Sequence, residues 1–271
     1  MSSELVSIIV PTKNSQNFIG NCLESLSRQS YSNIEIIVVD NFSSDRTREI
    51  GKKYTNKVFQ KGPERSAQRN FGARKSKGDY LLFVDSDMVV FEQVVEKCVE
   101  KVKKSGAEAV VIPEFSFGKG FWAKCKQLEK AIYMGDELIE APRFFSKKAF
   151  EKVGGYDEQI ISGEDWMLKE KIEKKHAIGR IEKPIYHNEG GLSFFRSLGK
   201  KYYYGKHFHH YRKKSAEAAA RIDPLIRSKI LLMKFNLYKK HPLVFAGLTV
   251  LKTGEFLAGR CGMIIAKFKN K

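Results

Sequence analysis

Short apolar runs rich in β-branched residues alternate with longer segments in which apolar residues recur every three or four positions. The short runs predict strands over residues 5–10, 34–39, 80–84 and 109–112. The longer segments predict helices over residues 17–28, 45–54, 66–77 and 91–104. Strands that alternate with helices are typical of βαβ units, so this part of the chain predicts an α/β fold with a mostly parallel central sheet.

The alternation stops near residue 119. A longer helical segment is expected over 119–140, then a helix over 164–174 and a strand over 185–187. From residue 193 the pattern is helical and rich in Lys, Arg, Tyr and His. It is broken at His241-Pro242, and two apolar stretches follow at 243–251 and 256–268. We therefore expect two domains, residues 1–192 and residues 193–271, the second made of basic and amphipathic helices.

The net charge of +18 is concentrated in the second domain. Residues 196–271 hold 18 Lys and Arg against 3 acids, whereas residues 1–195 hold 31 against 28. A module this basic suggests nucleic acid, anionic lipid or phosphorylated substrates as partners. The last two apolar stretches are interrupted by Lys252, Glu255 and Arg260, and neither reaches the ~18 apolar residues of a membrane span. They fit helices that lie in a membrane interface, the alternatives being packing on the domain or dimerisation.

The four cysteines are far apart and form no C-x-x-C pair. This spacing favours reduced packing residues in a cytosolic protein over a zinc site or a disulfide framework. Together with the basic amphipathic helices, it predicts a cytoplasmic protein that is peripheral at the cytoplasmic face of a membrane.

Two carboxylates, Asp85 and Asp87, follow the apolar run at 80–84. Carboxylates at the exposed end of a buried strand suit a hard divalent cation, and open α/β sheets bind ligands at these strand ends. An Asp-x-Asp pair is a weak signal by itself. Its context decides whether it marks a site.

Polar residues also follow the first two strands. Thr12 and the main chain near Pro11 are placed to frame a base, and Asp40 to accept hydrogen bonds from a nucleobase or ribose. A cap or turn is the alternative role for Asp40, and Asp45 is expected to N-cap the next helix. Arg69 falls in the first turn of a helix with Ser66 as expected N-cap, where phosphate binds readily. A surface arginine is the alternative.

These segments occur in the same order in a known family. Residues 6–14 and 38–45, Arg69-Asn70-x-Gly72, Asp85-Ser86-Asp87, residues 154–158 and Gly163-Glu164-Asp165 together resemble the family 2 glycosyltransferases, over about residues 4–190. The resemblance implies an inverting enzyme with a GT-A domain, a Rossmann-like fold that binds nucleotide-diphospho-sugars. It also implies a binding or catalytic role for individual residues.

Donor and metal binding are implied at the matching positions. Nucleotide-sugar contacts would come from Pro11, Thr12, Asn14, Asp40, Arg69 and Asp85. The metal, Mn²⁺ or Mg²⁺ bridging the diphosphate, would be bound by Asp87, with Asp85 and His187 as further ligands. A divalent cation stabilises the charge that develops on the leaving diphosphate without a proton. For His187 a half-buried structural imidazole is the alternative.

The resemblance makes Asp165 the general base, with Glu164 orienting the acceptor or capping the helix. A hydroxyl acceptor loses a proton as it attacks, whereas a phosphate acceptor is already ionised and needs no base. The Glu-Asp pair therefore favours a hydroxyl acceptor, such as a lipid-linked or cell-envelope glycan. The chain lacks the Gln-x-x-Arg-Trp motif of processive relatives, which suggests transfer of a single sugar.

Aromatic and basic residues are interleaved over 200–214, a composition that also suits nucleic acid. The helical spacing of His207, His209 and His210 does not place all three on one face, which argues against a metal site there. We interpret this segment as a membrane-proximal helix whose Arg196 and Lys200 help to hold diphosphate. Nucleic acid is not expected as a partner, and an anionic membrane surface is.

The predicted function is therefore inverting transfer of one sugar from a UDP- or GDP-sugar to a hydroxyl acceptor. Two alternatives stay open: a polyprenyl-phosphate sugar synthase, and a nucleic-acid or anionic-lipid binding protein on an inactive nucleotide-binding scaffold. A nucleotidyltransferase is a nearer rival, but no Gly-rich loop with a catalytic Lys occurs near residue 1.

Overall fold

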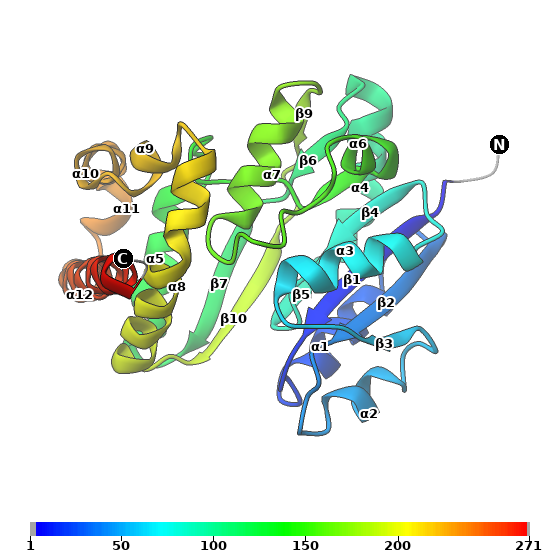
Figure 1. Cartoon of the computed structure of the whole chain (residues 1–271), viewed down its shortest axis with the longest axis horizontal. Coiled ribbons are helices and arrows are strands. Elements are labelled where there is room, and N and C mark those ends of the chain that lie inside the picture. Colours follow the sequence, from blue (N-terminus) through cyan, green and yellow to red (C-terminus); the bar gives the residue numbers. More distant parts are fainter. Residues whose placement is uncertain (1–3, 270–271) are drawn as a thin grey trace. The chain divides into compact units, whose positions relative to one another are not determined.

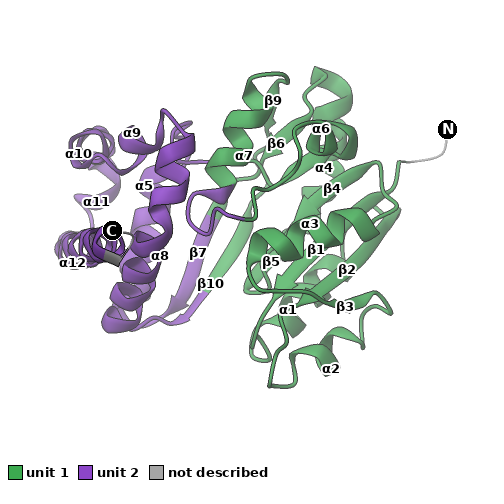
Figure 2. Ribbon diagram, in the orientation of Figure 1, with its two compact units in different colours: residues 1–114, 141–158, 165–188 green, residues 115–140, 159–164, 189–271 purple. Residues whose placement is uncertain are grey.

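The computed structural model describes residues 4–269 and forms two compact units (Figures 1 and 2). Unit 1 comprises residues 1–114, 141–158 and 165–188, and unit 2 comprises residues 115–140, 159–164 and 189–271. The two units alternate along the chain, and each has a hydrophobic core of its own.

Unit 1 is built on a seven-stranded sheet. Its strand order is β3 (Val58–Gln60), β2 (Ile34–Asp40), β1 (Val6–Thr12), β4 (Tyr80–Phe83), β8 (Phe144–Ser146), β6 (Ala109–Val111) and β9 (Ile178–Arg180). The first four strands are parallel, β8 is antiparallel to both neighbours, and β6 and β9 are again parallel. The predicted mostly parallel sheet is confirmed.

Helices cover both faces of this sheet because successive side chains of a strand point to opposite faces. On β1, Ile8 belongs to the cluster that contains the buried residues of α1 (Ile19–Ser27) and α4 (Val94–Ser105). The next residue, Ile9, belongs to the cluster of α3 (Arg65–Lys75), α6 (Lys147–Lys152) and α7 (Glu164–Glu173). The short helix α2 (Thr47–Gly51) follows β2.

The parallel register brings the carboxyl ends of β1, β2 and β4 to one edge of the sheet. Thr12, at the end of β1, lies opposite Asp40 at the end of β2. On the other side of β1, Ile9 lies opposite Phe83, and the chain reaches Asp85 two residues later. This shared edge gathers the polar residues that follow the predicted strands.

A smaller sheet has the order β5 (Met88–Val90), β10 (Ile185–Gly191) and β7 (Glu114–Lys119). In the antiparallel pair of β5 and β10, Met88 lies opposite His187. Asp87 directly precedes Met88, so this register brings Asp87 near His187.

Unit 2 is mainly helical. Its helices are α5 (Phe121–Tyr133), α8 (Phe194–Lys214), α9 (Ala218–Ile222), α10 (Pro224–Met233), α11 (Phe235–Tyr238) and α12 (Pro242–Lys269). The long helix α12 packs against α8 and α5. Leu128 and Ile132 of α5 share a core with Leu248 and Leu251 of α12. Within residues 4–269, no helix has both the length and the hydropathy needed to cross a membrane.

Several predicted elements differ from the structure. β8 was not predicted, because its three residues, Phe144–Ser146, do not form a β-branched run. The helix expected over 119–140 ends at Tyr133, before Gly135 with its positive φ of 79°. The two apolar stretches at 243–251 and 256–268 are one helix, α12, since Lys252 and Glu255 form ion pairs within unit 2 and do not end it.

The break at His241-Pro242 is confirmed, because α12 begins at Pro242. The four cysteines are free thiols: Cys22, Cys98 and Cys125 are buried as predicted, whereas Cys261 is exposed.

Candidate functional site

Asp85, which follows β4, lies between two arginines. Nη2 of Arg69 donates a hydrogen bond to its Oδ1 at 2.8 Å, and Nη1 of Arg143 donates to its Oδ2 at 3.3 Å. Burial raises the pKa of Asp85, but the two guanidinium groups outweigh this and hold its pKa well below the usual range. Asp85 is therefore an ionised carboxylate with both oxygens engaged by protein cations.

Arg69 links Asp85 to Asp165. The fully buried side chain of Arg69 lies on α3, and its Nη1 donates to Oδ1 of Asp165 at 2.9 Å. Asp165 is the second residue of α7, and 36% of its side chain is exposed. The predicted base is thus oriented by a rigid cation while its carboxylate still meets solvent.

Glu114 continues the same chain of charges. Its Oε2 accepts from Nη2 of Arg143 at 3.1 Å, and its Oε1 lies 3.3 Å from Nδ1 of His187. Nε2 of His187 lies 3.1 Å from Oδ2 of Asp87. We call this unit 1 series the strand-end network: Asp165, Arg69, Asp85, Arg143, Glu114, His187 and Asp87.

His187 lies between two carboxylates. Burial lowers the pKa of its imidazole, but the hydrogen bonds to Asp87 and Glu114 raise it to about 10. The main chain fixes this arrangement, since the Asn188 N–H donates to the Asp87 carbonyl at 2.8 Å. The two carboxylates therefore favour the protonated imidazole.

The donor atoms of Asp87 and His187 suit a divalent cation. A carboxylate oxygen and an imidazole nitrogen 3.1 Å apart can bind the same ion once the imidazole loses its proton. Asp85 is arranged differently, with both oxygens bonded to arginines. Among residues 4–269, no three His, Cys, Asp or Glu side chains are grouped to hold a metal. The three-ligand set of Asp85, Asp87 and His187 stays a prediction.

At the predicted nucleoside end, Asp40 is fully buried. The Ser43 N–H donates to its Oδ2 at 2.9 Å, and the Ser43 hydroxyl bonds its Oδ1. The turn role considered for Asp40 is confirmed by these bonds, and its contact with a nucleoside stays a prediction. Asn14 has a positive φ of 48°, and its Oδ1 accepts from the Ser44 N–H at 2.9 Å. The loops after β1 and β2 are thereby held together.

Pro11 and Thr12 are the last two residues of β1. The Thr12 side chain is 3% exposed, and its Oγ1 has no hydrogen-bond partner among the residues described. Gln68 on α3 donates to the main-chain carbonyls of Thr12 and Val39, at 2.9 and 2.6 Å. An unsatisfied buried hydroxyl at a strand end is unusual and points to a ligand.

Two capping predictions need correction. The structure has Glu64, not Ser66, as the N-cap of α3, and Ser66 lies within the helix, which starts one residue earlier than expected. Asp45 is not the N-cap of α2, which is Arg46, although Asp45 Oδ1 does accept from the Thr47 N–H at 3.0 Å. The surface alternative for Arg69 is wrong, because its side chain is buried.

The remaining predicted residues belong to unit 2. Glu164 is buried at the start of α7, and Arg196 and Lys200 are exposed on α8. Their roles towards acceptor or diphosphate stay predictions.

Arg143 and Glu114 were missed by the sequence interpretation. Neither lies in a motif: Glu114 follows Pro113 after β6, and Arg143 precedes a strand that was not predicted. Both become visible only when the sheet brings them beside Asp85.

The family follows from comparison with known proteins. The model of "Glycosyl transferase family 2" matches residues 7–176, which span the whole strand-end network except His187. This chain belongs to glycosyltransferase family 2. The glycosyltransferase GlyG of Streptococcus pneumoniae is 36% identical over 116 residues, which are 40% of this chain and 38% of that protein. The chain aligns with less than two thirds of the length of each of the first three curated relatives.

Solved structures establish the fold of this glycosyltransferase as GT-A. Staphylococcus aureus TarS in complex with UDP-GlcNAc superposes with a TM-score of 0.56 at 19% identity, covering 98% of this chain and 92% of TarS. The mannosyltransferase PcManGT of Pyrobaculum calidifontis, in complex with GDP-Man and Mn²⁺, gives 0.57 at 17% identity, covering 99% and 87%. The predicted fold class and the prediction of a transferase enzyme are confirmed.

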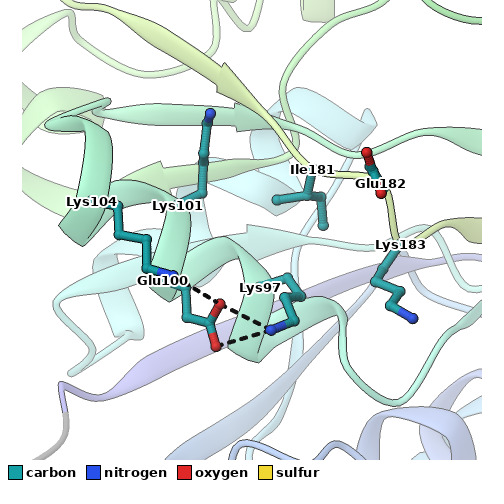
Figure 3. A pocket seen from close by; sticks show the side chains of 7 residues that line it. All are labelled: Lys97, Glu100, Lys101, Lys104, Ile181, Glu182 and Lys183. Atoms are coloured by element: carbon teal, nitrogen blue, oxygen red, sulfur yellow. Dashed lines mark hydrogen bonds and ion pairs between the residues drawn. The ribbon is translucent and has the colours of Figure 1, made fainter.

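A separate hollow of unit 1 lies beside α4, and none of the predicted site residues lines it (Figure 3). Its volume is about 280 Å³, and its lining comprises Lys97, Glu100, Lys101, Lys104, Ile181, Glu182 and Lys183. Lys97 pairs with Glu100 at 2.9 Å within one turn of α4. The strand-end network, and not this hollow, is therefore kept as the candidate site.

Proposed function

We propose that this glycosyltransferase moves one sugar, with inversion, from a UDP- or GDP-sugar to a hydroxyl acceptor such as a lipid-linked or cell-envelope glycan. The single observation that carries the proposal is the bridge made by Arg69 between Asp85 and Asp165. It joins a carboxylate at a nucleotide-binding strand end to the carboxylate that would serve as base.

Asp165 is suited to take the proton of the acceptor. Its Oδ1 is held by Arg69, and the partly exposed carboxylate can meet an incoming hydroxyl. As the hydroxyl oxygen attacks the anomeric carbon, the bond to the diphosphate breaks and the proton passes to Asp165. General-base catalysis of this kind contributes about 10²–10⁴-fold.

Asp87 and His187 would hold a divalent cation, Mn²⁺ or Mg²⁺. When bound, that cation would neutralise charge on the leaving diphosphate. Arg69 and Arg143 keep Asp85 ionised beside it, so that Asp85 can accept a hydrogen bond from the ribose. This division assigns Asp87 to the metal and Asp85 to the nucleoside.

The nucleotide would bind at the ends of β1 and β2. The unsatisfied hydroxyl of Thr12 supports this placement, because a bound base or ribose would supply its partner. The relatives that carry UDP-GlcNAc or GDP-Man support a nucleotide-diphospho-sugar as donor.

A thermal-shift screen of nucleotide sugars with Mn²⁺ identifies the donor, because ligand binding raises the melting temperature by mass action. Transfer is then measured for Asp165→Asn and Asp87→Asn. We expect Asp165→Asn to lower kcat by about 10²–10⁴-fold and to keep the donor-induced shift. We expect Asp87→Asn to lose the part of the shift that depends on Mn²⁺.

Asp79→Asn is the matched control, since Asp79 is an exposed aspartate that precedes β4 at its opposite end. Unchanged turnover in both site variants contradicts the proposal. Full transfer to a polyprenyl phosphate by Asp165→Asn would instead indicate an acceptor that needs no base.

A further inference from the structure

Unit 2 exposes much of its apolar surface on three consecutive helices. Among the residues described, 21 large apolar side chains are exposed, and 13 of them lie in residues 225–268. These 13 belong to α10, α11 and α12, which lie together at one edge of the unit (Figure 2). Leu225, Leu232 and Leu243 are 81%, 70% and 79% exposed. Apolar surface this concentrated marks an interaction site.

Helix α12 has two distinct faces. Its inner face buries Leu248, Leu251 and Glu255 in unit 2. Its outer face carries the apolar stripe, which we define as Leu243, Val250, Leu257 and Ile264, all at least 52% exposed. These four residues recur every seven positions, so they lie on one side of the helix. The stripe runs along most of a helix about 40 Å long.

The exposed charges on these helices have one sign. The segment 224–268 contains a single acid, Glu255, and it is 3% exposed. Its exposed cations are Lys229, Lys239, Lys240, Arg260 and Lys267. An apolar surface accompanied only by positive charge complements an anionic lipid surface, where Lys and Arg reach the headgroups and apolar side chains enter the acyl boundary.

Two other partners, a second copy of the chain and nucleic acid, fit this surface less well. In a coiled coil with a second copy, with the stripe at the a positions, the d positions would be Ala246, Thr253, Arg260 and Lys267. Like charges would then face each other. Nucleic acid would engage the cations and leave Leu243 and Leu257 in water.

We propose that α10, α11 and α12 dock on the surface of an anionic lipid bilayer, with the apolar stripe at the headgroup boundary. This docking does not depend on the proposed sugar transfer, because the strand-end network lies in unit 1.

The test is flotation of the full chain with vesicles of phosphatidylcholine alone or mixed equally with phosphatidylglycerol. We expect binding to the mixed vesicles that weakens as salt is raised. Leu232→Glu and Leu243→Glu should each weaken binding at least about tenfold, since each removes the burial of one Leu. Tyr54→Glu, at an exposed aromatic of unit 1, is the matched control and should bind as the wild type does.

A second pair of variants tests the charges. Lys239→Gln/Lys240→Gln should weaken binding about thirtyfold, and Lys52→Gln/Lys53→Gln, a pair of exposed lysines on unit 1, should not. Circular-dichroism melts verify that each variant is folded.

Three results overturn the proposal. The first is equal flotation of the unit 1 controls and the unit 2 variants. The second is a stable dimer in solution that Leu243→Glu dissociates while vesicles bind nothing. The third is tight oligonucleotide binding that Lys239→Gln/Lys240→Gln abolishes in the absence of any vesicle binding.

Discussion

Each unit contains a network of alternating charges, but the two differ in their balance and exposure. The strand-end network of unit 1 has four acids and three cations, and its terminal acids, Asp87 and Asp165, are 38% and 36% exposed. The helix network of unit 2, which we define as Lys126, Glu129, Lys201, Lys252 and Glu255, has two acids and three amines. Its Glu129 and Glu255 side chains are only 12% and 2% exposed.

The strand-end network has one acid more than it has cations, and the helix network has one amine more than it has acids. In unit 1 the extra carboxylate lies at an exposed end, where it can attract a cation or accept a proton. In unit 2 Glu129 and Glu255 pair with Lys126 and Lys252, at 2.6–2.9 Å, and Lys201 is the odd amine. Burial, and then repulsion from Lys252, lowers the pKa of Lys201 to about 7. The first network presents carboxylates to solvent, and the second holds α5, α8 and α12 together.

Arg69→Met should have the largest effect, because it affects both function and folding. The variant leaves the carboxylates of Asp85 and Asp165 without their shared cation. We expect the free energy of unfolding to fall by about 3–5 kcal/mol and sugar transfer to be lost. Urea titration and a transfer assay measure the two effects.

The double variant Arg69→Met/Asp85→Asn serves as the control for charge. It should regain part of the lost stability and no transfer, since it removes a carboxylate that has lost one of its two arginines and leaves Asp165 unoriented. Wild-type transfer by Arg69→Met would show that the bridge has no role in the site.

Glu255→Gln should destabilise the protein by about 3–5 kcal/mol while leaving the kcat for a soluble acceptor unchanged. The substitution removes the acid that pairs with Lys126 and Lys252 and that accepts from the Ser197 hydroxyl at 2.5 Å. Replacing a whole pair is far milder than breaking it, so Lys252→Met/Glu255→Leu should be near the wild type in urea. A drop in kcat without a loss of stability would mean that the helix network belongs to the site.

Lys201→Met should stabilise the protein at pH 7, because it removes an amine whose charged form is disfavoured by burial and by Lys252. The amine is protonated in the unfolded chain up to about pH 10.4 and loses its proton in the folded protein near pH 7. Between these values the unfolded chain binds one more proton, so stability should rise with pH by up to about 1.4 kcal/mol per unit.

The Lys201→Met variant should lose this rise, and Lys213→Met, an exposed lysine of the same helix, should keep it. Equal pH slopes for the wild type and Lys201→Met would disprove the assignment of the titration.

The fold was predictable where elements are long and regular. The observed bounds of β1, β2, α1, α3 and α4 lie within a few residues of the expected ones. Buried strands and amphipathic helices of this length show a clear pattern of apolar residues. The three-residue strand β6 was predicted from its apolar run, whereas β3, β5, β8 and β9, also of three residues each, were not. Their existence depends on the neighbours with which they pair, and a linear pattern does not contain that information.

The site was predictable at the residues that belong to motifs. Asp85, Asp165 and Arg69 are brought together as expected: Asp85 follows β4, Asp165 lies in the first turn of α7, and Arg69 lies in the second turn of α3. Arg143 and Glu114 were not found, since their importance arises from the antiparallel insertion of β8. The helix network was also missed, because Lys and Glu on a helix surface predict solvent exposure.

Substitutions in the ion pair of Lys97 and Glu100 on α4 should have the smallest effect on stability. They test the comparison of the two networks with a pair that belongs to neither. The pair lies in the hollow of Figure 3, one turn apart, with side chains 40% and 38% exposed. Solvent screens exposed charges, and holding two flexible side chains together offsets the remaining attraction. Lys97→Met, Glu100→Leu and the double variant should therefore melt within error of the wild type. A clear coupling between the two substitutions would show that distance alone, and not burial, sets the contribution of an ion pair in this protein.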